Sequence, residues 1–134
     1  MAHHYEDGVI YNLHFSTPPT NEHWGEMLET VAANFKSGQL VRMFAKTDNA
    51  GPDAKQRDMM NRTVSECGLK VRIAVMTDSL LVRGMATALA WARVVDIRPF
   101  RMGEYREALD FLGSDQVDEG RARQVFGTLS HGVR

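Results

Sequence analysis

The segment at residues 69–76 sets the strongest limit on what this chain can fold into. It starts with alternating apolar and basic residues, Leu69-Lys70-Val71-Arg72, and then becomes continuously apolar up to Met76. A strand has this pattern when it runs from a solvated end into the middle of a sheet that is covered by helices. We therefore predict a central strand here.

Other segments alternate between strand and helix patterns. Residues 9–15 alternate in polarity after an Asp-Gly turn, which predicts the second arm of an N-terminal hairpin. Residues 40–45 and 94–100 predict further strands. Helices are predicted at residues 21–35 with Thr20 as N-cap, 52–67 with Pro52 in the first turn, 80–91, 102–112 and 116–129.

Strands that alternate with helices favour parallel strands joined by right-handed crossovers. We therefore expect an α/β fold with a mixed (α+β) sheet, a leading hairpin or strand, and helices packed on the sheet. At 134 residues the chain has the usual size of a single domain, in which 114–134 would form a C-terminal helical extension. The apolar stretch at residues 80–92 is shorter than the ~20 residues that a membrane span needs, so we interpret it as a buried helix.

The composition argues against several kinds of binding partner, against a disulfide and against secretion. The formal net charge of −1 gives no field that would draw the chain to nucleic acid or to an anionic membrane. Cys67 is the single cysteine, so no intramolecular disulfide can form. The first residues lack the basic and apolar layout of a signal peptide, and a cytoplasmic location is expected.

A family resemblance is carried by four stretches in the second half of the chain. They are Val75-Met76-Thr77-Asp78-Ser79-Leu80-Leu81-Val82-Arg83-Gly84, Ala88-Leu89-Ala90-Trp91, Ile97-Arg98-Pro99-Phe100 and Glu107-Ala108-Leu109-Asp110-Phe111-Leu112. With these stretches the chain resembles bacterial proteins of the SpoIIAA-like group over roughly residues 40–113. That group is related to the STAS domains of anti-sigma-factor antagonists and is grouped with the CRAL-TRIO lipid-binding domain.

The resemblance implies a STAS/SpoIIAA-like layered sheet and, for the antagonists, a protein-binding surface that is switched by phosphorylation of a serine at a helix start. The matching turn here is Asp48-Asn49-Ala50-Gly51-Pro52-Asp53, which contains no serine. The phosphorylation switch therefore cannot be assigned to that turn.

Thr77-Asp78-Ser79 before the predicted helix at 80–91 is the candidate site for a partner or an anion. Free backbone N–H groups and the helix dipole favour a bound anion or phosphoserine at such a position. Arg83 lies one turn further along, where it could pair with a phosphate. The alternative is that Asp78 or Ser79 only caps the helix.

The same helix provides a candidate dimer surface at Gly84, Ala88 and Trp91. Small residues let a second backbone approach closely, and a tryptophan can anchor the contact. Packing of these residues against the sheet is the alternative. We expect a homodimer.

No catalytic, metal-binding or cofactor-binding constellation is recognisable in the sequence. The histidines are scattered, at positions 3, 4, 14, 23 and 131, without the spacing of a zinc site. An acidic pair after the first strand, which phosphoacceptor receivers need for magnesium, is replaced by Ser16-Thr17-Pro18-Pro19.

Three functions follow as hypotheses. The first is a non-enzymatic regulatory or protein-binding domain of the STAS/SpoIIAA-like type, which binds a protein partner of unknown identity and also self-associates. The alternative is a small-molecule or lipid-binding domain, and the third is an enzyme whose site is not recognised. An apolar pocket lined by the helix at 80–91 would favour the second, and convergent polar groups in a cleft would favour the third.

Overall fold

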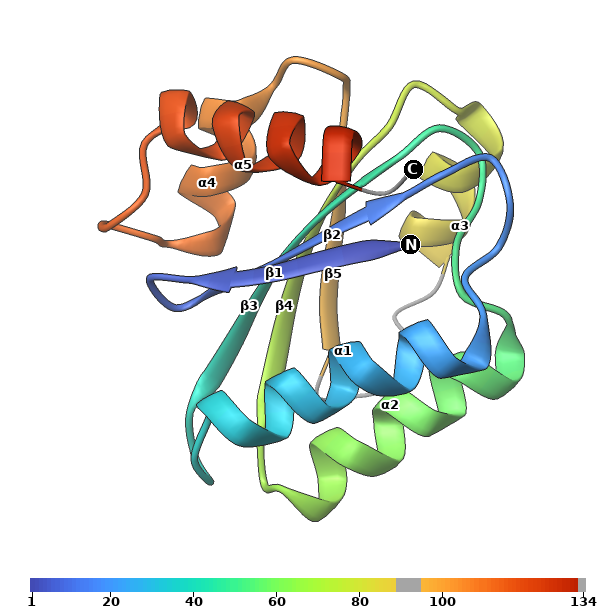
Figure 1. The fold of residues 1–134 in the computed structure, drawn as a ribbon, viewed down its shortest axis with the longest axis vertical. Coiled ribbons are helices and arrows are strands. Elements are labelled where there is room, and N and C mark those ends of the chain that lie inside the picture. The colour runs from blue at the N-terminus through green and yellow to red at the C-terminus, as the bar shows by residue number, and fades with distance from the viewer. Residues whose placement is uncertain (89–94, 133–134) are drawn as a thin grey trace.

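A five-stranded mixed sheet forms the centre of the computed structural model, which describes residues 1–88 and 95–132 (Figure 1). The strands lie in the order β1-β2-β3-β4-β5, with β1 antiparallel to β2 and every other pair parallel. The expected α/β fold is confirmed. The elements are β1 (Ala2–Glu6), β2 (Val9–His14), α1 (Asn21–Asn34), β3 (Leu40–Thr47), α2 (Ala54–Glu66), β4 (Lys70–Met76), α3 (Leu80–Ala88), β5 (Val95–Phe100), α4 (Tyr105–Leu112) and α5 (Glu119–Gly132).

The N-terminal hairpin has the turn that its sequence predicts. Glu6 pairs with Val9, so only Asp7 and Gly8 form the loop, and both have positive φ, of 50° and 81°. Two-residue loops with both residues in this region match the twist of the flanking strands, and Asp-Gly is among the pairs that tolerate it. The hairpin fixes the register of β2 against β1, and β2 in turn pairs with β3, the first of the parallel neighbours.

Helices cover both faces of the sheet. In Figure 1, α1 and α2 lie on one side and α4 and α5 on the other. All six residues of β2 are buried, because each face of this strand meets a helix layer. Along β2, the side chains of Val9, Tyr11 and Leu13 belong to the core under α4 and α5, while Ile10 belongs to the core under α1 and α2.

The helix α1 shows why the layer beside α2 forms. Thr20 caps it by accepting a hydrogen bond from the backbone N–H of His23, at 3.1 Å, as the sequence predicts. Its buried residues Trp24, Met27 and Val31 recur at helical spacing and form one apolar stripe. This stripe packs on the sheet, so α1 turns back over the strand that precedes it.

The opposite core is built around aromatic rings. Phe126 of α5 meets the ring of Phe44 at 5.1 Å between centroids and that of Tyr11 at 5.5 Å, both edge to face. Because Phe44 and Tyr11 are on β3 and β2, this cluster fixes α5 to the middle of the sheet.

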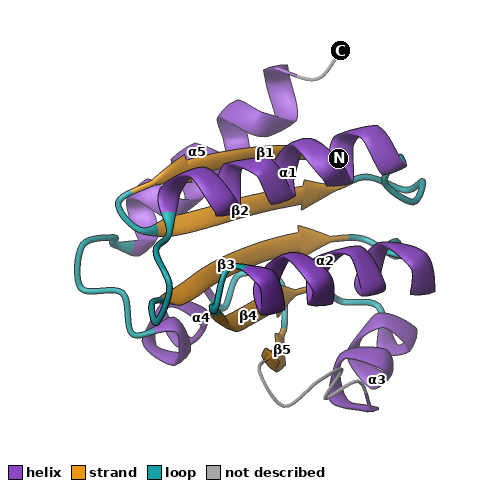
Figure 2. Cartoon of the chain, turned by 90° about the horizontal axis from the view of Figure 1, so that it is seen from below, coloured by secondary structure: helices purple, strands orange, loops and turns teal. Residues whose placement is uncertain are grey.

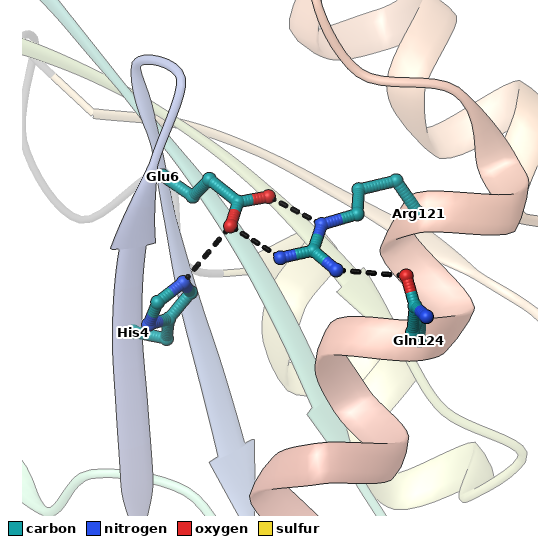
Figure 3. A network of polar contacts seen from close by, with 4 residues as sticks. All are labelled: His4, Glu6, Arg121 and Gln124. Carbon is teal, nitrogen blue, oxygen red and sulfur yellow. Dashed lines mark hydrogen bonds and ion pairs between the residues drawn. The ribbon is translucent and has the colours of Figure 1, made fainter.

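An ion pair also joins the end of β1 to α5 (Figure 3). The Glu6 carboxylate accepts hydrogen bonds from Nε and Nη2 of Arg121, at 2.6 and 2.5 Å, and Arg121 Nη1 donates to Gln124 at 2.7 Å. The hydrogen bonds from Arg121 lower the pKa of Glu6 to about 2. His4 Nε2 lies 3.3 Å from the same carboxylate.

The structure differs from the expectations in the position of one strand and at the starts of two helices. The strand β4 has a neighbour on each side, as predicted, but the middle strand is β3. Pro52 lies before α2 and not in its first turn, because Asp53 caps that helix in a capping box with Gln56. The helix α4 begins at Tyr105 and not at Met102, since a turn with Gly103 at a φ of 90° precedes it.

The predicted burial of the helix at residues 80–91 is wrong at its start. Leu80 is 81% exposed and Leu81 is 72% exposed. Among the described residues the main contact of α3 is with β5, and Figure 2 shows α3 near β5, on the other side of α2 from α1. The first turn of α3 therefore lies outside the layer that α1 and α2 form over the sheet.

Candidate functional site

The placement of α3 leaves a cavity of about 380 Å³ between the helices and the sheet. It lies toward the carboxyl ends of the parallel strands, which is where open α/β sheets usually bind ligands. Its lining comes from four strands, from α1, α2 and α3, and from the loops after β2 and β3. The lining residues are Asn12, His14, Ser16, Pro18, Trp24, Met43, Ala45, Thr47, Asn49, Ala50, Gly51, Pro52, Arg57, Met60, Ile73, Val75, Leu81, Val82 and Ile97.

The floor of the cavity is one face of the sheet. Asn12 on β2 pairs with Ala45 on β3, which pairs with Val75 on β4, so these three side chains form a row. His14 and Thr47 form the next row toward the strand ends. The small side chain of Ala45 lies between larger neighbours and leaves space above the sheet.

The walls are mostly apolar and come from three helices. Trp24 of α1 and Met60 of α2 stand on one side, and Leu81 and Val82 of α3 on the other. An apolar concave surface of this size with a few polar groups is the usual form of a small-molecule site. Arg57 is the one charged residue among the described lining residues.

Two polar side chains on the floor have no protein partner for one of their atoms. Within the described part of the chain, Oδ1 of Asn12 and Nδ1 of His14 are buried and accept or donate no hydrogen bond. Asn12 is only 3% exposed and His14 6%. An unpaired buried polar atom costs about 1–3 kcal/mol, so a fold retains such atoms in native structures only for a specific reason.

Burial also fixes the charge state of the floor. Desolvation lowers the pKa of His14 to about 4, with a smaller contribution from the positive amino terminus of the chain. The imidazole is therefore neutral at physiological pH. The centroid of its ring lies 6.4 Å from that of Trp24, a residue of the cavity wall on α1.

A buried glutamine holds the wall in place. Nε2 of Gln56 donates to the carbonyl of Pro19 at 2.7 Å, and its Oε1 accepts from the backbone N–H of Asp53 at 3.0 Å. The backbone carbonyl of Gln56 accepts from Nε1 of Trp24 at 2.8 Å. These bonds connect α1, α2 and the loop before α1, so the position of Trp24 is determined by the fold.

The residues of the predicted anion site have structural hydrogen bonds. Thr77 is buried, and its hydroxyl donates to the carbonyl of Asp48 and accepts from the N–H of Ser79. Asp78 accepts from the N–H of Met102 at 3.1 Å, and Ser79 accepts from the N–H of Val82 at 3.3 Å. Ser79 therefore caps α3, and Asp78 ties its start to the loop after β5.

The other predicted site residues lie along α3. Arg83 donates its backbone N–H to the carbonyl of Ser79 at 3.0 Å, which places it one turn after the cap. Gly84 is exposed on α3 with open space around its Cα. Ala88 is the last residue of α3, and Trp91 lies outside the described residues.

Sequence reasoning missed Asn12 and His14 on the cavity floor and Gln56, which holds the cavity wall in place. Each is a polar residue within a segment that was correctly assigned as strand or helix, where polar residues ordinarily face water. One signal for their burial is present in the sequence. The apolar stripe of α1 has to cover one face of the preceding strand, and the polar side chains on that face are then buried.

The described residues hold no group of three or more His, Cys, Asp or Glu side chains that could bind a metal ion. No helix in the described ranges has the length and apolar composition that crossing a bilayer requires. Comparison with family models, curated proteins and solved structures gives no match.

Proposed function

We propose that this chain is a non-enzymatic domain that binds a small, largely apolar molecule in the cavity between α2 and α3. One observation carries the proposal: the cavity is apolar over most of its lining, and its floor includes the buried polar residues Asn12 and His14. It also meets the criterion of an apolar pocket lined by the helix at 80–91, because Leu81 and Val82 form one wall. A cytoplasmic location is part of the same proposal and fits the free thiol of Cys67.

Filling the cavity is expected to abolish binding without harming the fold. Ala45→Leu places a larger apolar side chain on the floor, so the affinity for the neutral apolar dye Nile red should fall at least tenfold. Ala33→Leu is the matched control, because Ala33 is exposed on α1 away from the cavity. Dye fluorescence measures binding and thermal melts verify folding. Absence of dye binding to the parent, or equal binding by both variants, would contradict the proposal.

A second candidate function is supported by the exposed start of α3. We propose as this alternative that the chain is a SpoIIAA-like regulatory domain that binds protein partners and forms a homodimer through α3. Leu80 and Leu81 are the large hydrophobic side chains that the described structure exposes most, and exposed apolar residues side by side are typical of protein contacts.

Light scattering tests this alternative. The parent should be a dimer at high concentration, and Leu80→Glu should convert it to a monomer because a carboxylate would be buried in the contact. Leu80 is chosen since Leu81 also lines the cavity. Ala33→Glu, which places the same charge on exposed α1, should leave the dimer intact. A parent that stays monomeric would exclude this contact.

A further inference from the structure

We propose that the cavity is closed by a second copy of this chain, whose exposed Leu80 enters it, so that self-association and ligand binding exclude each other. This inference rests on the proposed binding function and joins it to the dimer contact through α3. The observations that carry it are two exposed leucines beside an apolar cavity and the uncharged character of the exposed residues that line it.

An apolar knob and an apolar hole lie side by side at the start of α3. Leu80 is 81% exposed and Leu81 is 72% exposed, and Leu81 also lines the cavity. The apolar lining therefore continues out of the cavity onto the surface of the helix. Exposed apolar residues that join a pocket in this way are typical of contacts in which a side chain of the partner fills the pocket.

One chain provides both halves of such a contact. In a dimer with two-fold symmetry the same patch of both subunits meets, so each residue makes its contact twice. Leu80 directly precedes the lining residues Leu81 and Val82. A two-fold axis beside the start of α3 therefore brings the Leu80 of each subunit over the cavity of the other, and two identical insertions form together.

The charge of the rim also favours a second copy as the occupant. The exposed ones among the described lining residues are all uncharged: Ser16, Pro18, Asn49 and Leu81. A two-fold contact sets identical residues close to one another, so a charged rim would repel its own copy. Arg57, the charged lining residue, is half-buried and donates from Nη1 to the carbonyl of Pro52 at 3.2 Å.

The cavity has room for the inserted side chain. A cavity of ~150 Å³ already accepts benzene, and this one has a volume of about 380 Å³. Met60, Val75 and Ile97 provide apolar surface for a leucine inside it. A polycyclic dye such as Nile red needs most of the same space, so the dye and Leu80 of the partner subunit cannot be bound together.

The test measures the affinity for Nile red against protein concentration. If only the monomer has an open cavity, the apparent affinity for the dye is reduced by the fraction of chains that are monomeric. At concentrations about a hundredfold above the dimer dissociation constant that fraction is below about one in ten, so the affinity should fall roughly tenfold relative to dilute protein. Light scattering provides the dissociation constant, and an excess of dye should convert the dimer to monomer.

Leu80→Glu isolates the contribution of the inserted leucine. Leu80 is not among the described lining residues, so the cavity of the variant itself is unchanged, whereas a carboxylate would be buried unpaired on insertion into the other subunit. The variant should bind Nile red with the affinity of the dilute parent at every concentration. Ala33→Glu, with the same charge on exposed α1, should keep the concentration dependence of the parent.

Ala45→Leu separates insertion from a contact between the two surfaces alone. Ala45 is only 6% exposed on the cavity floor, where a partner that touches the rim does not reach it. A leucine at this position takes up space that the inserted Leu80 needs, so the dimer dissociation constant should rise at least tenfold. Ala33→Leu should leave it unchanged, and thermal melts verify that both variants are folded.

The remaining outcomes separate the two proposals. A parent that binds dye but stays monomeric, or a dimer that persists when saturated with dye, would overturn the insertion and leave the binding function standing. The same holds if Ala45→Leu is folded and dimerises as tightly as the parent. Failure of the dye to bind both the dilute parent and Leu80→Glu would overturn the binding function itself.

Discussion

Phe126→Ala is expected to lower the free energy of unfolding by about 3–5 kcal/mol, the largest effect of any single substitution considered for this chain. The Phe126 ring is almost completely buried between Phe44, Tyr11 and Tyr105. Its removal leaves a cavity between α5 and the sheet that rigid aromatic neighbours cannot fill. Urea denaturation with a two-state fit measures the loss.

The control for this substitution is Thr128→Ala, at an exposed position on the same helix, which should change stability by less than about 0.5 kcal/mol. The pair also tests how the region 114–134, expected as a helical extension, contributes to the domain. A loss below about 1 kcal/mol for Phe126→Ala would mean that α5 is attached loosely and that the sheet is stable without it.

Acidification from pH 7 to pH 4 is expected to destabilise the protein through His14 by up to about 3 kcal/mol. The folded-state pKa of this histidine is lowered to about 4 by burial. Between its ordinary value of 6.5 and this value, the unfolded chain binds a proton that the folded chain does not. The stabilisation is therefore complete above pH 6.5 and is lost as the pH falls toward 4.

Comparison of the parent with His14→Phe isolates this effect. Urea denaturation at several pH values should show that the stability of the parent, relative to the variant, falls by about 3 kcal/mol between pH 7 and pH 4. Burial also lowers the pKa of His3, but His3 titrates in both proteins and cancels. Glu6, with a pKa of about 2, loses its contribution only below pH 4.5. Parallel stability curves for the two proteins would show that His14 is solvated in the native state.

The secondary structure was predictable because local patterns decide it. The stripe of Trp24, Met27 and Val31 identifies α1, and the Asp-Gly pair identifies the hairpin. The burial of α3 was not predictable, since the apolar character of its sequence does not reveal which neighbours cover it. Leu80 and Leu81 are exposed because α3 lies in the last parallel crossover, between β4 and the edge strand β5, outside the layer formed by α1 and α2.

The candidate site was less predictable than the fold. Asn12 and His14 alternate with apolar residues, as the residues on the solvent-exposed face of a strand do. Only the positions of α1 and α2 over the sheet make these two side chains buried. Thr77, Asp78 and Ser79 attract attention in the sequence because helix starts bind anions, but their side chains bond within the protein. A local motif could not distinguish a cap from a site.

The proline in β5 has a consequence for how this sheet meets other chains. Pro99 pairs with Val75 at the outer strand of the sheet and lacks a backbone N–H. Edge strands that carry proline resist β-augmentation, in which a foreign strand extends the sheet by main-chain hydrogen bonds. The β5 edge is thereby a poorer template for edge-to-edge pairing, because a foreign strand would find no N–H donor at Pro99.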